Sequence, residues 1–260
     1  MKSVNRITEL LNKKDRGLLS VYFTAGYPAL DSVRDIILAL QEGGVDMIEI
    51  GVPFSDPMAD GKVIQESSSR ALDNGMSLGF LLDCLEGIRP QCSLPLVLMG
   101  YLNPMMQYGT ERLFERCVQI GIDALIIPDL PFNEYMKGYK KYCEKYDIPV
   151  IMLITPETPE GRIRLIDDNC GGFIYMVSSA STTGTRGKFT AEQLAYFKRI
   201  DKMCLKNKRL IGFGISGRET LSAAFSASNG AIVGSLFIEC LSRASSVNEA
   251  VSLLKERLNA

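Results

Sequence analysis

The sequence predicts an α/β protein folded as a single (β/α)8 TIM barrel, with an extra helix before the first strand. Short apolar runs rich in β-branched residues recur along the chain, each followed by an amphipathic segment. Strict alternation of strand and helix implies parallel strands with right-handed crossovers. The 260 residues carry no linker or break in composition, and one barrel takes about 250 residues. We therefore expect one domain over residues 1–260, with a doubly wound open sheet as the alternative.

Each expected element follows from its own pattern. Residues 1–17 carry apolar side chains at helical spacing without the long apolar core of a secretion signal, and predict an amphipathic helix. The eight expected strands are Leu18–Phe23, Asp46–Gly51, Leu94–Met99, Asp123–Ile127, Val150–Ile154, Gly172–Val177, Arg209–Phe213 and Gly230–Val233. The clearest helices between them are Asp31–Glu42, Thr110–Ile120, Glu160–Asp168 and Ala191–Met203.

Composition limits the chemistry that this chain can perform. Apolar residues make up 46% and the net charge is −1, so neither disorder nor binding to nucleic acid or an anionic membrane is expected. There is no histidine, which excludes histidine bases, triads and metal ligands. The seven cysteines include no C-x-x-C pair and indicate free thiols in a reduced, cytoplasmic protein. No apolar run reaches the roughly 18 residues needed to span a bilayer.

The second strand places a carboxyl inside the barrel. Ile48 and Ile50 are expected to face the surrounding helices, so Met47, Glu49 and Gly51 face the interior. Glu49 is near the C-terminal end of its strand, where barrel active sites are built, and burial should raise its pKa. A glutamate held by a structural partner is the alternative.

The loop after this strand adds two more acids. Asp56 and Asp60 are expected over the same barrel mouth, in a segment stiffened by Pro53 and Pro57. Spacing alone leaves open whether these aspartates only form turns or caps.

The whole loop, Gly51-Val-Pro-Phe-Ser-Asp-Pro-Met-Ala-Asp-Gly61, closely resembles the signature loop of the tryptophan synthase α-subunit family. Further segments resemble the family in chain order, at residues 22–28, 101–104, 127–131, 155–159, 212–216 and 230–235. The resemblance spans essentially the whole chain. It implies a (β/α)8 barrel that cleaves indole-3-glycerol phosphate to indole and glyceraldehyde 3-phosphate in tryptophan biosynthesis.

The resemblance also implies roles for particular residues. Glu49 matches the catalytic acid/base, Asp60 the carboxylate on the indole N–H, and Tyr175 an active-site tyrosine, which parity with Phe173 also points inward. Tyr22 stands on the indole-pocket strand, where phenylalanine is commoner. Residues 178–188 match a lid loop, in which Thr183 aligns with a residue that hydrogen-bonds the Asp60 carboxylate; a plain flexible loop is the alternative.

The available residues suit such a cleavage. No expected strand ends in lysine and histidine is absent, so neither a Schiff-base nor a metal aldolase is indicated. An indole ring protonated at C3 acts as its own electron sink, and two carboxylates then suffice as acid, base and charge stabiliser.

The loops after the seventh and eighth strands are candidates for phosphate binding. They contain Gly212, Phe213, Gly214, Gly234 and Ser235, and Ser235 is expected to cap the short helix Leu236–Leu241.

Gly184 matches a further phosphate contact of the family. Arg218 is the one cation adjoining these turns, so backbone amides would carry most of the binding; turn glycines without a ligand are the alternative. Residues 212–217 also spell G-x-G-x-x-G, but the acidic residue of a dinucleotide site is missing at the end of the next strand.

The family resemblance implies a partner. The expected assembly is an α2β2 heterotetramer with a β-subunit that holds pyridoxal phosphate, and this chain is expected to hold no cofactor and no metal. Lys62 stands where the family commonly has proline, in a loop that contacts the partner. A stand-alone indole-releasing lyase and a non-catalytic allosteric binding subunit are the alternatives, with a phosphosugar isomerase barrel more distant.

Overall fold

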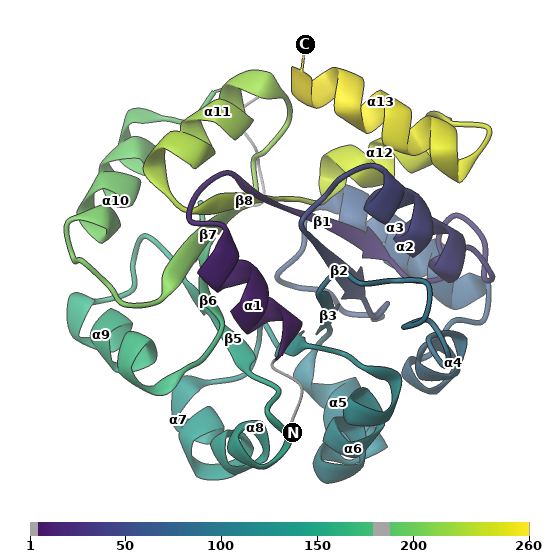
Figure 1. Cartoon of the computed structure of the whole chain (residues 1–260), viewed down its shortest axis with the longest axis horizontal. Coiled ribbons are helices and arrows are strands. Elements are labelled where there is room, and N and C mark those ends of the chain that lie inside the picture. Colours follow the sequence, from purple (N-terminus) through teal and green to yellow (C-terminus); the bar gives the residue numbers. More distant parts are fainter. Residues whose placement is uncertain (1–4, 179–187, 260) are drawn as a thin grey trace.

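The computed structural model describes residues 5–178 and 188–259, and its strands form a closed parallel barrel ringed by helices (Figure 1). Neighbours in the barrel follow chain order, and β8 returns to pair with β1. The predicted fold class is therefore confirmed, and the open sheet is excluded. The strands are β1 (Leu18–Thr24), β2 (Met47–Gly51), β3 (Leu96–Met99), β4 (Ala124–Ile126), β5 (Val150–Ile154), β6 (Phe173–Val177), β7 (Lys208–Gly212) and β8 (Gly230–Val233).

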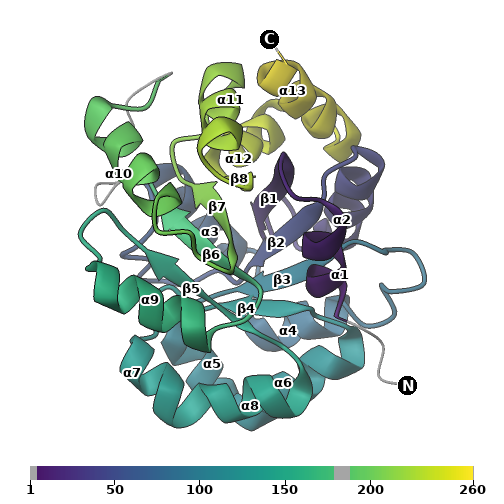
Figure 2. The same cartoon turned by 60° about the vertical axis from the view of Figure 1, so that its left-hand side comes forward.

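The outer layer consists of helices on all sides of the barrel (Figures 1 and 2). The helices are α1 (Arg6–Lys13), α2 (Val33–Glu42), α3 (Lys62–Asp73), α4 (Leu78–Cys84), α5 (Leu102–Tyr108), α6 (Thr110–Ile120), α7 (Phe132–Glu134), π-helix η1 (Tyr135–Tyr139), α8 (Lys140–Tyr146), α9 (Glu160–Asn169), α10 (Ala191–Asp201), α11 (Arg218–Ala227), α12 (Ser235–Arg243) and α13 (Val247–Asn259). None of the helices within the described ranges has the length and apolar character needed to cross a membrane.

The fourth strand begins one residue later than predicted because a polar side chain precedes it. Asp123, expected in the fourth strand, lies just before β4, where its carboxylate accepts the Leu96 backbone N–H and pairs with Arg89 and Arg6. A carboxylate with these partners sits at the rim of the barrel and not within its apolar wall.

Helix α1 covers the N-terminal end of the barrel, across the centre of Figure 1. Asn5 caps it by accepting the Ile7 N–H at 2.9 Å, and the Asn5 amide also donates to the carbonyls of Asp123 and Asp147. Ile7, on the inner face of this helix, is fully buried. Since this end is covered, a substrate must enter at the opposite end, where the strands terminate.

Strand register confirms the predicted inward face of β2. Glu49 pairs with Tyr22 on β1 and with Val97 on β3, and it is fully buried. Two glycines leave room for tyrosine rings in the interior. A Cβ at Gly51 would lie 2.1 Å from the Tyr22 hydroxyl, and one at Gly212 would lie 2.1 Å from the Tyr175 hydroxyl.

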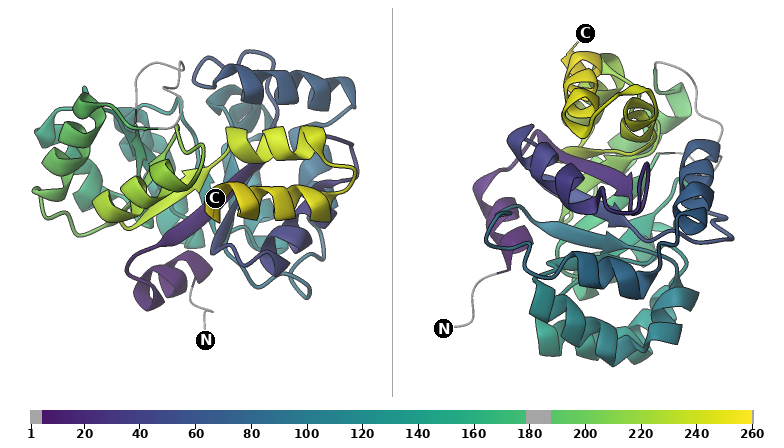
Figure 3. Two further views of the ribbon diagram at one scale, coloured as in Figure 1. Left: turned by 90° about the horizontal axis from the view of Figure 1, so that it is seen from above. Right: turned by 90° about the vertical axis from the view of Figure 1, so that its right-hand side faces the viewer.

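Helices α12 and α13 lie side by side next to β1 and α2 (Figure 3). The expected cap of α12 is corrected here. Gly234 is the N-cap, no side chain caps the helix, and Ser235 is its first residue. The helix also runs to Arg243, two residues past the predicted end at Leu241.

Candidate active site

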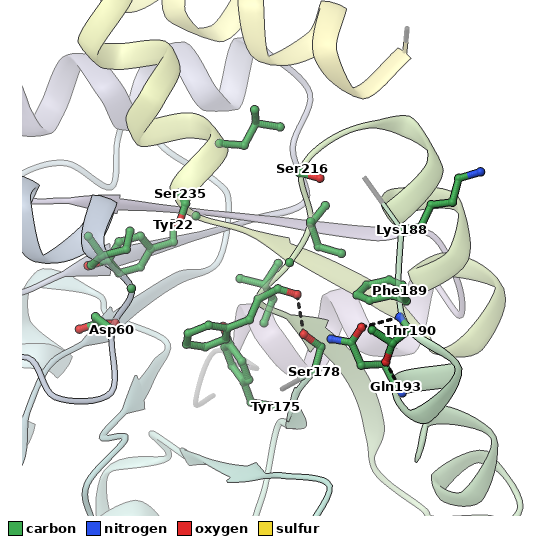
Figure 4. Close-up of a pocket in the computed structure, with 18 of the residues that line it drawn as sticks. Tyr22, Asp60, Tyr175, Ser178, Lys188, Phe189, Thr190, Gln193, Ser216 and Ser235 are labelled. Carbon is green, nitrogen blue, oxygen red and sulfur yellow. Dashed lines mark hydrogen bonds between the residues drawn. The ribbon is translucent and has the colours of Figure 1, made fainter. Parts of the chain in front are cut away.

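A cavity of about 630 Å³ opens at the C-terminal end of the barrel (Figure 4). Its walls come from strand ends and from the first turns of α10 and α12. Seven of the predicted site residues line it: Tyr22, Asp60, Tyr175, Phe213, Gly214, Gly234 and Ser235. Glu49 and Gly212 do not line it, and Thr183 and Gly184 fall outside the described residues.

Glu49 lies in the barrel interior next to the cavity wall. Its Oε1 accepts a hydrogen bond from the Ser20 hydroxyl at 2.8 Å, whereas its Oε2 is buried without a partner among the described residues. Burial raises the pKa of Glu49 from the ordinary 4.5 to about 8, and the Ser20 hydrogen bond opposes that rise. At neutral pH the group is therefore a protonated acid.

Asp60 lies in the cavity wall and is held by a tyrosine. The Tyr101 hydroxyl donates to Asp60 Oδ2 at 2.9 Å and accepts the Ala59 backbone N–H at 3.0 Å. Tyr101 also stacks on Phe54, with ring centroids 5.0 Å apart, so one side chain fixes both ends of the loop. Burial raises the pKa of Asp60 from 3.8 to about 6, opposed by the Tyr101 hydrogen bond. At neutral pH Asp60 is mainly ionised.

Tyr22 and Tyr175 line the cavity together with Asp60 (Figure 4). Burial raises the pKa of each phenol well above 10, and the charges of Glu49 and Asp60 raise it further. Both phenols are therefore neutral hydrogen-bonding groups at physiological pH. Tyr175 also meets the Phe213 ring edge-on, with centroids 6.3 Å apart.

The turn after β7 has an unusual backbone. Phe213 and Gly214 both have positive φ, +67° and +77°. For phenylalanine this left-handed conformation costs of the order of 1 kcal/mol. The Ser178 hydroxyl donates to the Phe213 carbonyl at 2.8 Å and stabilises the turn. Phe213 and Gly214 of this turn line the cavity, as do Gly234 and Ser235.

The cations at this end differ from the expectation. Arg218, the one cation predicted beside the turns, is not in the cavity lining, whereas Arg257 of α13 is. The Arg257 guanidinium donates to the Ser216 carbonyl at 3.5 Å. No local motif marks Arg257, because it comes from the last helix and reaches the turn only through the packing of α13.

Asp56 differs from the expectation that both loop aspartates face the barrel mouth. It is exposed, lies outside the cavity lining, and accepts the neighbouring Ser55 hydroxyl at 2.5 Å. Residues 179–187 of the expected lid fall outside the described part of the chain. Within the described ranges, no group of three or more Cys, Asp or Glu side chains is arranged to hold a metal ion.

The geometry combines an ionised acid and two backbone turns around one cavity with a protonated acid beside it in the barrel interior. A neutral carboxyl can donate a proton to carbon and recover one from a hydroxyl, while a nearby carboxylate stabilises positive charge. The amides of Gly214 and of the α12 N-terminus suit an anion such as a phosphate ester. The arrangement fits acid–base cleavage of a phosphorylated substrate.

Comparison with known proteins gives consistent matches over the whole chain. The family model for the tryptophan synthase alpha chain matches residues 8–259. The alpha chain of Parabacteroides distasonis is 53% identical, covering 98% of this chain and 99% of that protein. The alpha chain of Bacteroides fragilis is 51% identical, covering 98% and 97%.

Solved structures match in the same way. A mutant tryptophan synthase alpha-subunit from Pyrococcus furiosus has a TM-score of 0.86 at 33% identity, covering 95% of this chain and 99% of that one. A tryptophan synthase chain from M. tuberculosis has a TM-score of 0.84 at 25% identity, covering 98% and 97%.

Proposed function

The chain belongs to the tryptophan synthase alpha chain family, and from that premise we propose how its own residues carry out the family's reaction. The reaction is the retro-aldol cleavage of indole-3-glycerol phosphate to indole and glyceraldehyde 3-phosphate, a carbon–carbon lyase step of tryptophan biosynthesis. The observation that carries the proposal is the pair Glu49 and Asp60, whose pKa values of about 8 and about 6 lie on either side of neutrality.

Glu49 is the proposed acid and base. Its protonated carboxyl gives a proton to indole C3, and the resulting carboxylate takes the proton of the side-chain hydroxyl on the carbon attached to C3. The C–C bond then breaks, its electron pair returns to the ring, and the aldehyde forms with no net gain or loss of protons. Since Glu49 does not line the cavity, this proposal requires its carboxyl to turn toward the cavity when substrate binds.

Asp60 and the two tyrosines are proposed to hold the indole. The ionised Asp60 accepts the indole N–H and stabilises the positive charge that protonation of C3 places on the ring nitrogen. Tyr101 keeps that carboxylate in place through its 2.9 Å hydrogen bond. Tyr22 and Tyr175 supply the aromatic and hydroxyl surface of the pocket; Thr183 is proposed to reach Asp60 from the lid.

The phosphate is proposed to lie between the turns after β7 and β8. The backbone amides of Gly214, Gly234 and Ser235 bind it, with Gly184 as a further contact and Arg257 adding positive charge at the rim. Gly212 has a different task in this proposal, because its missing side chain makes room for Tyr175. Phe213 presents the turn and contacts the Tyr175 ring.

The partner is a tryptophan synthase β-subunit, in an α2β2 assembly that we propose to operate in the cytoplasm. In this proposal the β-subunit consumes the indole and holds the pyridoxal phosphate, while the reaction in this chain runs on its own carboxyls. Lys62 opens α3 at the end of the carboxylate loop and is largely exposed, where a partner could contact it.

The roles are tested by single-turnover release of glyceraldehyde 3-phosphate from the isolated chain. We expect Glu49→Gln to lower the single-turnover rate constant 10²- to 10⁴-fold, the usual contribution of a general acid–base. Asp60→Asn should also lower this rate constant. Asp56→Asn, an exposed change in the same loop, is the control and keeps the wild-type rate. Because the chain contains no tryptophan, indole fluorescence shows whether each variant still binds substrate. Glu49→Gln turnover within tenfold of wild type would contradict the assignment.

A further inference from the structure

Ser20 is a polar residue inside the apolar wall of the barrel, and the reaction described above gives it no task. It is fully buried on β1, two residues before Tyr22 and on the same inward face. Its hydroxyl lies 2.8 Å from Glu49 Oε1, the one acceptor that the described part of the chain offers it. A buried hydroxyl is retained in such a wall at a cost unless it forms a hydrogen bond.

The direction of this hydrogen bond distinguishes the two oxygens of Glu49. The Ser20 hydroxyl donates to Oε1. Because the carbonyl oxygen of a carboxylic acid accepts hydrogen bonds more strongly than its hydroxyl oxygen, this contact favours Oε1 as the carbonyl oxygen of the protonated acid. The proton then resides on Oε2, which is buried and has no partner among the described residues. The unpartnered atom is therefore the one that carries the transferable proton.

We propose that Ser20 is a positioning residue for the reaction, which fixes the proton of Glu49 on Oε2 and holds Oε1 while Oε2 turns toward the substrate. The inference rests on the proposed role of Glu49 and adds to it the residue that determines which oxygen reacts. Ser20 touches no substrate and acts only through the carboxyl of Glu49.

The other titratable groups around Glu49 do not supply this function. Tyr22 on β1 and Tyr175 on β6 stay neutral because burial raises the pKa of both phenols. Asp60, in the loop after β2, bonds to Tyr101, and the register partner of Glu49 on β3 is the apolar Val97. Ser20 is thus the hydrogen-bond donor that the structure gives Glu49.

The test uses Ser20→Thr and Ser20→Val, which match in shape and differ by the hydroxyl alone. The hydrogen bond favours the charged form of Glu49, so its loss raises the pKa of Glu49. In Ser20→Val we expect the high-pH limb of the kcat profile to move up by about one pH unit. We also expect kcat to fall about tenfold as the carboxyl loses its orientation. Ser20→Thr should restore both.

Two further measurements separate the possible outcomes. Carboxyl-carbon NMR of Glu49 in each variant, with Glu49→Gln to assign the signal, gives the pKa directly and does not depend on activity. If Ser20→Val keeps the wild-type profile, rate and Glu49 titration, the inference about Ser20 is overturned. If Glu49→Gln itself turns over normally, the proposed function fails first. A loss of rate without any movement of the pKa would mean that Ser20 only packs the barrel, and would also overturn the inference.

Discussion

The substitution Glu49→Gln should make the folded protein more stable relative to the wild type as the pH rises. A carboxyl whose pKa is raised by folding binds its proton more tightly in the folded state. The unfolded chain releases that proton above the ordinary pKa of 4.5, whereas the folded chain retains it up to about 8. Folding therefore becomes less favourable between these two values because of Glu49, and an uncharged glutamine removes the dependence.

The magnitude follows from the same displacement. At 1.36 kcal/mol per pH unit, moving the pKa from 4.5 to about 8 costs the wild type about 4–5 kcal/mol above pH 8 and under about 1 kcal/mol at pH 5. Glutamine can still accept the Ser20 hydrogen bond, but its amide N–H groups lack partners, at a pH-independent cost of about 1–3 kcal/mol. The stability difference, variant minus wild type, should therefore rise by about 4 kcal/mol from pH 5 to pH 8.5.

Urea denaturation followed by far-ultraviolet circular dichroism at several pH values measures this difference. Glu256→Gln, the same chemical change at an exposed position of α13, is the control and should give a flat line. A Glu49→Gln difference that stays constant or falls with pH would refute the reasoning, because it would mean that the barrel holds Glu49 as a carboxylate.

Three further predictions concern the neighbours of the catalytic carboxyls. Tyr101→Phe removes the donor to Asp60 and raises its pKa above about 6; since Asp60 must be ionised, the low-pH limb of kcat/KM should move up by about one pH unit. Arg257→Ala should raise KM for the phosphorylated substrate about fivefold with little change in kcat, as expected for a partly exposed ion pair worth about 1 kcal/mol. Gly212→Ala puts a Cβ 2.1 Å from the Tyr175 hydroxyl; it should cost about 1–3 kcal/mol of stability and at least tenfold in kcat.

Each of these has a matched control in the same chain. Arg218→Ala removes a neighbouring cation outside the cavity lining and should leave KM unchanged. Equal increases in KM at Arg218 and Arg257 would indicate a long-range electrostatic effect and not a contact with the phosphate. Gly79→Ala, in a helix with open space around the new methyl group, should be neutral or slightly stabilising. An unmoved low-pH limb in Tyr101→Phe would contradict the assignment of Asp60 as the ionised group.

Much of the fold was predictable because it depends on local patterns. The alternation of Ile48, Glu49 and Ile50 is enough to direct Glu49 inward. The strand–helix alternation predicts a parallel sheet, and eight such units in one unbroken chain favour a closed barrel over an open sheet. The bounds of β5, β8 and α6 agree with the expectation. The predicted start of a strand was wrong where a polar side chain such as Asp123 forms ion pairs at the rim of the barrel. Its partners Arg6 and Arg89 are far away in sequence, so the local pattern does not reveal them.

The site residues that sequence reasoning missed depend on contacts between distant segments. Tyr101 lies 41 positions from Asp60, and nothing in its own segment shows which carboxylate its hydroxyl meets. Arg257 reaches the phosphate end only because α13 packs beside α12. Ser20 was the exception, because its own segment could have identified it. A hydroxyl at an inward position of an apolar strand, two residues before Tyr22, indicates a buried polar partner.

The most direct test of the central claim is glyceraldehyde 3-phosphate release from indole-3-glycerol phosphate by the wild-type chain, alone and with a tryptophan synthase β-subunit. We predict slow turnover alone and clear acceleration by the partner. Fast turnover that the partner leaves unchanged would indicate a stand-alone lyase. No turnover in either condition, with the β-subunit still activated, would contradict the catalytic assignment and leave a non-catalytic binding subunit.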